Sequence, residues 1–207
     1  MRRILTTSLI VLLCAAVPFA AWAARPEKSA PTGHLHPVST TQAAPKGLAP
    51  ILAKARLATA KYATSLAAAR KAGYTVNVTR SIPDMGWHFL NPKIKGFDAS
   101  KPPILVYVKR GNAWHLVAFE WVFPAKPAKP PLPGATYGTF GAACHYSDGT
   151  FVPAGAEADC PKTSPESGTA FGFWHPDFVT LHLWAWYPNP DGIFAGKNPL
   201  VRPFNGN

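Results

Sequence analysis

The feature that most constrains the fold is a pair of apolar segments, residues 104–109 and 113–122, separated by Arg110-Gly111-Asn112. Glycine and asparagine accept the backbone conformations of tight turns, so the pattern predicts a β-hairpin. With the turn at residues 110–112, Lys109 is expected to lie opposite Ala113. Such a hairpin makes the core of the chain an antiparallel sheet.

The expected register decides which side chains share a face of the hairpin, because side chains alternate along a strand. One predicted row contains Ile104, Val106, Val108, Trp114, Leu116, Ala118 and Glu120, and the other contains Leu105, Tyr107, Lys109, His115, Val117, Phe119 and Trp121. Glu120 thus falls in the more aliphatic row. Because burial of an ionised carboxylate without a partner is costly, Glu120 must be paired, protonated, metal-bound or in water at the sheet end.

The N-terminus predicts export. Arg2 and Arg3 precede an apolar run, and Ala21-Trp22-Ala23 matches a small-residue cleavage site, so residues 1–23 are expected to be a signal peptide. Residues 24–47 are rich in Ala, Pro, Ser and Thr, which predicts a disordered tail. Residues 48–207 then form a single domain, located in the periplasm or outside the cell. No later stretch is apolar and long enough to be a transmembrane segment.

The cysteines agree with an oxidising compartment. Cys14 lies in the predicted signal peptide, which leaves Cys144 and Cys160 to form one disulfide. A Cys/His metal site that includes His145 is the alternative interpretation. The formal net charge is +11, and removal of Arg2 and Arg3 leaves +9. The basic residues are dispersed and form no nucleic-acid motif, which favours a solvated charged surface, with an anionic envelope surface as the alternative partner.

The remaining patterns predict an α+β fold. Apolar residues recur every three or four positions after Pro50, which predicts one amphipathic helix that ends at a cap on Gly73. Further strands are expected at residues 74–80, 85–90, 139–146 and 179–187. We therefore expect the helix to pack on a curved antiparallel sheet, with a β-sandwich carrying an added helix as the alternative.

Three motifs in the strands resemble a group of uncharacterised exported bacterial proteins. They are Met85-Gly86-Trp87-His88 with Asn91-Pro92, Leu116-Val117-Ala118-Phe119-Glu120-Trp121 before Pro124, and Leu181-His182-Leu183-Trp184-Ala185-Trp186 with Asn189-Pro190-Asp191-Gly192 and Asn198-Pro199. The similarity covers residues 62–201. It implies a shared fold and a shared site built on His88, Glu120 and His182, but no reaction.

Two histidines and one carboxylate on different strands are typical of a metal triad. His88, Glu120 and His182 could bind zinc, copper or iron, and His175 is a candidate for a fourth ligand or a supporting partner. The alternative is a structural or ligand-orienting polar cluster in which a histidine hydrogen-bonds Glu120. Trp87, Trp114, Trp184 and Trp186 are candidates for lining a pocket, although large aromatics also belong in a core.

Motifs of several enzyme classes are missing from the sequence. It contains no Gly-x-Ser-x-Gly elbow, no Gly-x-Gly-x-x-Gly pattern and no phosphate loop, which argues against a serine hydrolase or a nucleotide enzyme. We expect an exported module that binds a small ligand or a transition metal, with no catalysis required. The alternatives are a metal-dependent hydrolase or oxygenase and an envelope protein that binds glycan or lipid.

Overall fold

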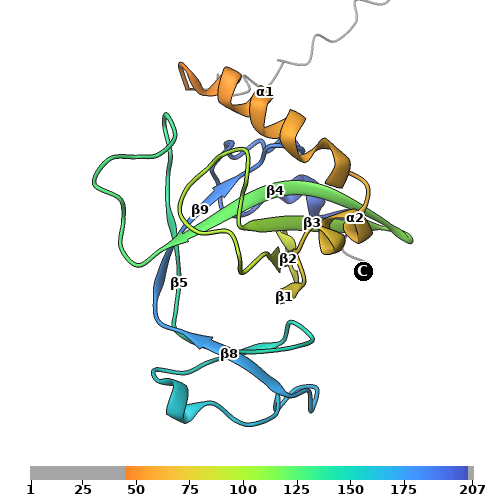
Figure 1. Cartoon of the computed structure of the whole chain (residues 1–207), viewed down its shortest axis with the longest axis vertical. Coiled ribbons are helices and arrows are strands. Elements are labelled where there is room, and N and C mark those ends of the chain that lie inside the picture. Colours follow the sequence, from red (N-terminus) through yellow and green to blue (C-terminus); the bar gives the residue numbers. More distant parts are fainter. Residues whose placement is uncertain (1–44, 205–207) are drawn as a thin grey trace, which may run out of the picture. The chain divides into compact units, whose positions relative to one another are not determined.

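The computed structural model describes residues 45–204 (Figure 1). The predicted signal peptide, 1–23, and residues 24–44 of the predicted tail lie outside the described residues. Within 45–204, no helix is long and apolar enough to cross a lipid bilayer. The described chain combines a helical region with antiparallel sheets, which confirms the α+β fold with helices on a curved sheet.

The helical region is divided into three segments instead of one continuous helix. They are α1 (Leu48–Thr59), the 3-10 turn η1 (Ala60–Tyr62) and α2 (Leu66–Lys71). The helix is interrupted at residues 63–65, and the Ser65 hydroxyl caps α2 by accepting a hydrogen bond from the Ala68 amide. Serine competes with the backbone for hydrogen bonds, which explains why it starts a helix here rather than continuing one. Gly73 follows α2 with φ of 105°, as the predicted cap requires.

Six antiparallel strands form the main sheet. They are β1 (Val76–Ile82), β2 (Gly86–Leu90), β3 (Ile104–Arg110), β4 (Ala113–Phe123), β5 (Gly138–Phe140) and β9 (Phe178–Leu183). Their order in the sheet is β1-β2-β3-β4-β9-β5. The predicted strand 179–187 therefore ends at Leu183. Strand β9 pairs with β4, although about 55 residues separate the two strands in the sequence. This pairing places His182 opposite Glu120.

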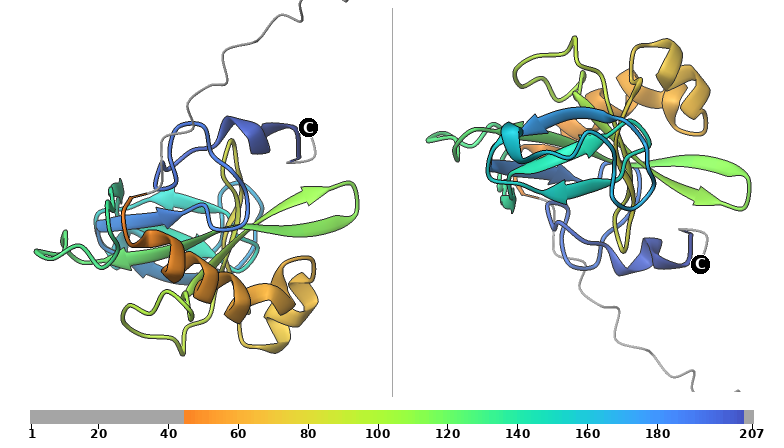
Figure 2. Two further views of the ribbon diagram at one scale, coloured as in Figure 1. Left: turned by 90° about the horizontal axis from the view of Figure 1, so that it is seen from above. Right: turned by 90° about the horizontal axis from the view of Figure 1, so that it is seen from below.

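The two faces of the main sheet are covered differently. The helices pack on the face that carries Leu105, Tyr107, Phe119 and Trp121, where they bury the larger hydrophobic cluster. On the opposite face a smaller cluster gathers Val106, Val108, Val117, Ala118, Trp184 and Val201. Val201 belongs to the 3-10 helix η3 (Pro199–Phe204), and Figure 2 shows this C-terminal segment and the helices on opposite sides of the sheet.

The register of the β3–β4 hairpin differs from the predicted one. Arg110 pairs with Ala113, and the pairing shifts between Val106↔Ala118 and Tyr107↔Leu116, so Val117 is an extra residue in β4. Such a bulge reverses the alternation of side chains on one side of it. Leu116 and Trp114 consequently pack with the cluster under the helices. The predicted register, which placed them in the row of Glu120, is wrong for this half of the hairpin. Beyond the bulge Glu120 pairs with Ile104, in the aliphatic row that was expected.

A second, three-stranded sheet lies below the main sheet in Figure 1, where β8 is labelled. It contains β6 (Ala143–Tyr146), β7 (Phe151–Pro153) and β8 (Phe171–His175), in the order β7-β6-β8. The predicted strand 139–146 thus divides between two sheets, as β5 and β6. The predicted disulfide is present between Cys144 in β6 and Cys160, which follows the 3-10 turn η2 (Glu157–Asp159). Because Cys144 is in this disulfide, it has no free thiolate for the alternative Cys/His metal site.

Candidate functional site

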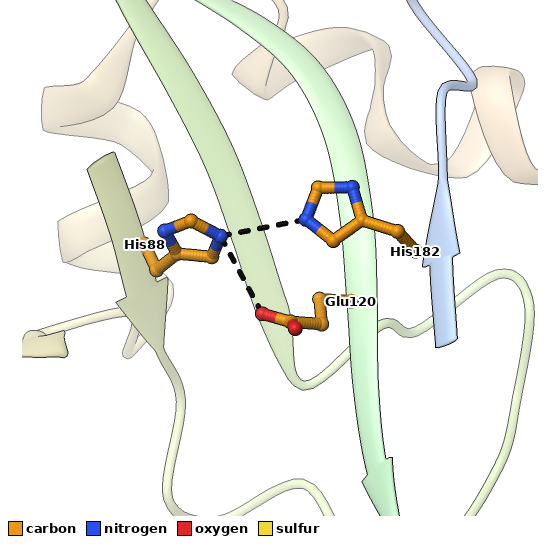
Figure 3. Close-up of side chains that lie close together, drawn as sticks. All are labelled: His88, Glu120 and His182. Atoms are coloured by element: carbon orange, nitrogen blue, oxygen red, sulfur yellow. Dashed lines mark hydrogen bonds and ion pairs between the residues drawn. The ribbon is translucent and has the colours of Figure 1, made fainter. Parts of the chain in front are cut away.

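Strand pairing brings the three predicted ligands together on one face of the main sheet. Glu120 on β4 lies directly opposite His182 on β9 in the antiparallel register. Strand β3 lies between β4 and β2. His88 on β2 pairs with Val106 on β3, and Val106 pairs with Ala118 on β4, so His88 lies close to Glu120 along the strand direction. Residues that pair across strands share a face. His88, Glu120 and His182 therefore project into one space, as Figure 3 shows.

The three side chains converge to metal-binding distances. One ligand atom from each lies within 4.8 Å of the other two. The Nε2 atoms of His88 and His182 are 3.4 Å apart, and His88 Nε2 is 3.5 Å from Glu120 Oε2. Good hydrogen bonds between such atoms measure about 2.7–3.2 Å. Two ligand atoms about 2.1 Å from one ion at a tetrahedral angle are about 3.4 Å apart, so the spacing fits a metal better than direct hydrogen bonds.

The two histidines are supported in different ways. His88 Nδ1 is 2.7 Å from the hydroxyl of Thr79, a buried residue on the neighbouring strand β1. A bond of this kind to the second ring nitrogen is typical of metal-binding histidines, because it orients the ring and its tautomer. His182 Nδ1 is buried and has no hydrogen-bond partner among the described residues. His182 therefore lacks the supporting contact that His88 has, for a metal ligand and for a structural histidine alike.

Burial keeps the group uncharged in the absence of a metal. Desolvation raises the pKa of Glu120 to about 8. It also lowers the pKa of His182 to about 4 and, together with repulsion from His182, that of His88 to about 3. At neutral pH the carboxyl is mostly protonated and both imidazoles are neutral. The 3.5 Å contact between His88 and Glu120 is therefore not a charged ion pair, and a cation could replace the carboxyl proton.

A cavity of about 170 Å³ lies against this group. His88 and Glu120 form part of its wall, together with Thr79 and Thr180. The rest of the wall is largely apolar and includes Val78, Ile82, Met85, Leu90, Ile104, Val122, Phe140, Phe173 and Phe178. Phe173 comes from β8, so both sheets contribute side chains to the cavity wall. The polar group thus faces a largely apolar cavity.

The structure does not place His175 with the three ligands. His175 lines the same cavity, but its Nε2 lies 2.9 Å from Nε2 of His145 and its Nδ1 lies 2.6 Å from the carbonyl oxygen of Pro176. His145 Nδ1 in turn lies 2.7 Å from the carbonyl oxygen of Val78. Both Nδ1 atoms donate to carbonyl oxygens, and the two Nε2 atoms face each other. The pair therefore connects β8 and β6 to β1, and it supports the cavity wall instead of adding a ligand.

Of the four tryptophans proposed as pocket lining, Trp184 and Trp186 line a groove, but a different one from the 170 Å³ cavity. Trp87 and Trp114 pack edge to face with ring centroids 5.1 Å apart, beside the cluster under the helices. Trp184 contacts the His182 ring and donates a hydrogen bond to the Ala195 carbonyl. Trp184 and Trp186 line this groove of about 850 Å³ together with Arg56, residues 187–189 and residues 191–195. Within residues 45–204, none of the four tryptophans lines the 170 Å³ cavity.

The sequence pattern missed several residues that build the site. They are Thr79, Phe173 and the His145–His175 pair, whose positions depend on the pairing of strands. The one sequence signal for strand β8 is the alternation of Phe171, Phe173 and His175. Gly86, two residues before His88, allows the close approach of β2 and β3, because a Cβ at this position would collide with the Tyr107 carbonyl oxygen.

Comparison with known proteins adds no further assignment. No protein-family model, curated protein or solved structure matches this chain.

Proposed function

We propose that this chain is an exported protein that binds one divalent transition-metal ion through His88, Glu120 and His182. The observation that carries the proposal is the convergence of the three ligand atoms within 4.8 Å, at separations longer than good hydrogen bonds. Export rests on the N-terminal sequence pattern and agrees with the Cys144–Cys160 disulfide.

The charges of the group favour a divalent ion. Glu120 supplies one negative charge when it loses its proton, and the two neutral imidazoles supply lone pairs. Two histidines, one carboxylate and an open position form a common zinc site, and the same set binds iron or copper. Zinc has no directional preference from its d electrons, so we expect it to accept the separations of 3.4 and 3.5 Å that His88 Nε2 makes with His182 and Glu120.

Metal analysis tests this proposal directly. Protein purified without chelator or histidine tag is expected to hold about one metal ion per chain, measured by elemental analysis, or to take up one zinc ion on reconstitution. His88→Ala and His182→Ala should each weaken binding by more than about 100-fold, because loss of a ligand costs more than loss of a supporting residue. His115→Ala is the matched control, since His115 lies on β4 but outside the group.

Two results would contradict the proposal. The first is folded wild-type protein that retains no zinc, copper or iron after reconstitution. The second is equal metal binding by wild type, His88→Ala and His182→Ala. Either result would leave the group as a polar cluster that supports the sheet or orients an organic ligand.

The cavity favours a second candidate, a metal-dependent hydrolase or oxygenase. His88 and Glu120 line the cavity, so an ion held by them would have an open coordination position next to this space. Catalytic zinc and iron sites keep such a position for water or substrate. In cobalt-substituted protein, a change in the visible absorption spectrum on addition of azide is expected if this position is open. An unchanged spectrum would argue for a closed, structural site.

A further inference from the structure

The cavity beside the three ligands has the size, lining and charge to select a particular class of small molecule. Its volume is about 170 Å³, and a protein cavity of about 150 Å³ is known to hold benzene. The space is therefore adequate for a compact group of roughly six to nine heavy atoms and too small for a long chain. Size alone sets this upper limit on the ligand.

The lining decides the chemical character of most of that molecule. Nine apolar side chains surround the space, among them the rings of Phe140, Phe173 and Phe178. Thr79, Thr139, Thr180 and His175 also reach the wall, but the Thr79 hydroxyl contacts His88 and both ring nitrogens of His175 make contacts of their own. Away from the metal-binding group, the polar partners that the wall offers a ligand are therefore mainly the hydroxyls of Thr139 and Thr180. A ligand with polar groups along its length would lose hydrogen bonds to water on entry.

The charge balance decides the character of one end. A divalent ion with the Glu120 carboxylate and two neutral imidazoles carries a net charge of +1. That charge would sit in a buried site where His88 and His182 are 3% and 4% exposed. A charge in such surroundings is unfavourable unless it is neutralised. A ligand with a single negative oxygen group at the open position makes the whole assembly neutral.

We propose that the site binds a compact apolar monocarboxylate, with the carboxylate on the metal and the hydrocarbon part in the 170 Å³ cavity. This inference rests on the metal binding proposed above and adds the ligand class. Val122 lies in the cavity wall and is 36% exposed, which places one part of the wall at the protein surface. We assign the entry of the ligand to this position.

The size dependence of carboxylate binding tests the inference. Cobalt-substituted protein is titrated with acetate, propionate, butyrate, benzoate and 1-naphthoate, and the visible spectrum of the metal is followed. We expect the dissociation constant to fall about three- to fourfold for each added methylene, in line with the transfer of apolar surface from water. Benzoate should bind more tightly than acetate by at least about 30-fold, and 1-naphthoate should bind more weakly than benzoate because it exceeds the cavity.

Two matched comparisons separate the charge from the cavity. Benzamide has the shape of benzoate without its charge, and it should bind at least about 10-fold more weakly. Val122→Phe narrows the surface side of the cavity and should weaken benzoate binding more than acetate binding while cobalt affinity stays unchanged. Leu57→Phe, at an 81% exposed position on α1, is the control and should change neither.

The outcomes distinguish this inference from the proposed function. If cobalt binds and the spectrum responds equally to acetate and benzoate, or to neither, the ligand class is wrong and the metal site stands. The same conclusion follows if benzamide binds as tightly as benzoate, or if Val122→Phe has no effect. If cobalt does not bind to the folded protein, both proposals fail together.

Discussion

Glu120 is the residue on which the chemistry of this protein depends. Its side chain is 13% exposed and lies between two neutral imidazoles, which gives it no cationic partner in the metal-free group. Burial raises its pKa to about 8 because the ionised form loses hydration. The same carboxylate becomes favourable when a cation binds. Metal binding at neutral pH should therefore release a proton, and metal affinity should increase as pH rises toward 8.

The three shifted pKa values predict a stability maximum for the metal-free protein near pH 6–7. Below pH 6.5 the unfolded chain binds more protons at His88 and His182 than the folded chain, so the free energy of unfolding rises with pH. Toward pH 8 the folded chain keeps the Glu120 proton that the unfolded chain has lost, so the free energy of unfolding falls, by up to about 1.4 kcal/mol per pH unit. Urea unfolding of chelated protein at several pH values measures this.

Glu120→Gln is the diagnostic variant for the upper half of this profile. It keeps the size and hydrogen-bonding capacity of the side chain but does not titrate. The loss of stability between pH 7 and 8 should disappear, while the rise below pH 6.5 remains. A variant whose profile still falls like wild type above pH 7 would show that Glu120 does not hold its proton in the folded protein.

Strand β2 shows how a single element fixes the position of a functional side chain. Gly86 starts β2 with φ of 120°, and His88 follows two residues later. A Cβ on Gly86 would collide with the backbone carbonyl of Tyr107 on β3. The close approach of the two strands therefore requires glycine, and it sets the register in which His88 pairs with Val106.

We expect Gly86→Ala to destabilise the protein by at least about 2 kcal/mol, because both the positive φ and the contact with Tyr107 are unfavourable for alanine. Metal affinity should fall as well, since β2 must move and takes His88 with it. Denaturant unfolding and zinc titration measure the two effects. Gly155→Ala is the control, because no atom lies within 4 Å of a Cβ there, and it should stay within about 0.5 kcal/mol of wild type. Equal stability of both variants would refute the steric argument.

At the scale of the whole molecule, the site depends on the cooperation of two sheets. The main sheet supplies the three ligands, and β8 of the second sheet supplies Phe173 to the cavity wall. The second sheet has only three short strands, so it buries little surface of its own. The Cys144–Cys160 disulfide ties β6 to the segment that follows η2. The His145–His175 pair reaches Val78 on β1, and Arg80 on β1 forms an ion pair with Asp148 in the turn between β6 and β7.

Removal of the disulfide should therefore affect the cavity more than the metal ligands. The Cys144→Ala/Cys160→Ala variant is expected to lose about 3 kcal/mol of stability, as for a loop of about 15 residues. Amide hydrogen exchange should increase chiefly in β6, β7 and β8, while zinc affinity changes little. An equal increase of exchange across β2, β4 and β9 would contradict this division of roles.

Much of this organisation follows from local sequence. The alternation in 104–109 and 113–122 predicted the hairpin, the Ala-rich periodicity predicted a helical region, and the two cysteines outside the predicted signal peptide predicted the disulfide. His88, Glu120 and His182 could be selected because a polar residue in an apolar strand pattern is visible in the sequence itself. These features depend on neighbours within a few residues, where propensity and side-chain alternation act.

Only the tertiary structure decided the geometry of the site. The extra residue Val117 reversed the faces of half of β4, and Ser65 divided the predicted helix. The convergence of the ligands depends on β9 pairing with β4, and the position of His175 depends on β8 pairing with β6. Each of these pairings joins segments far apart in the chain. Their energies come from contacts that local sequence patterns do not contain, so the sequence could nominate the ligands but could not place them.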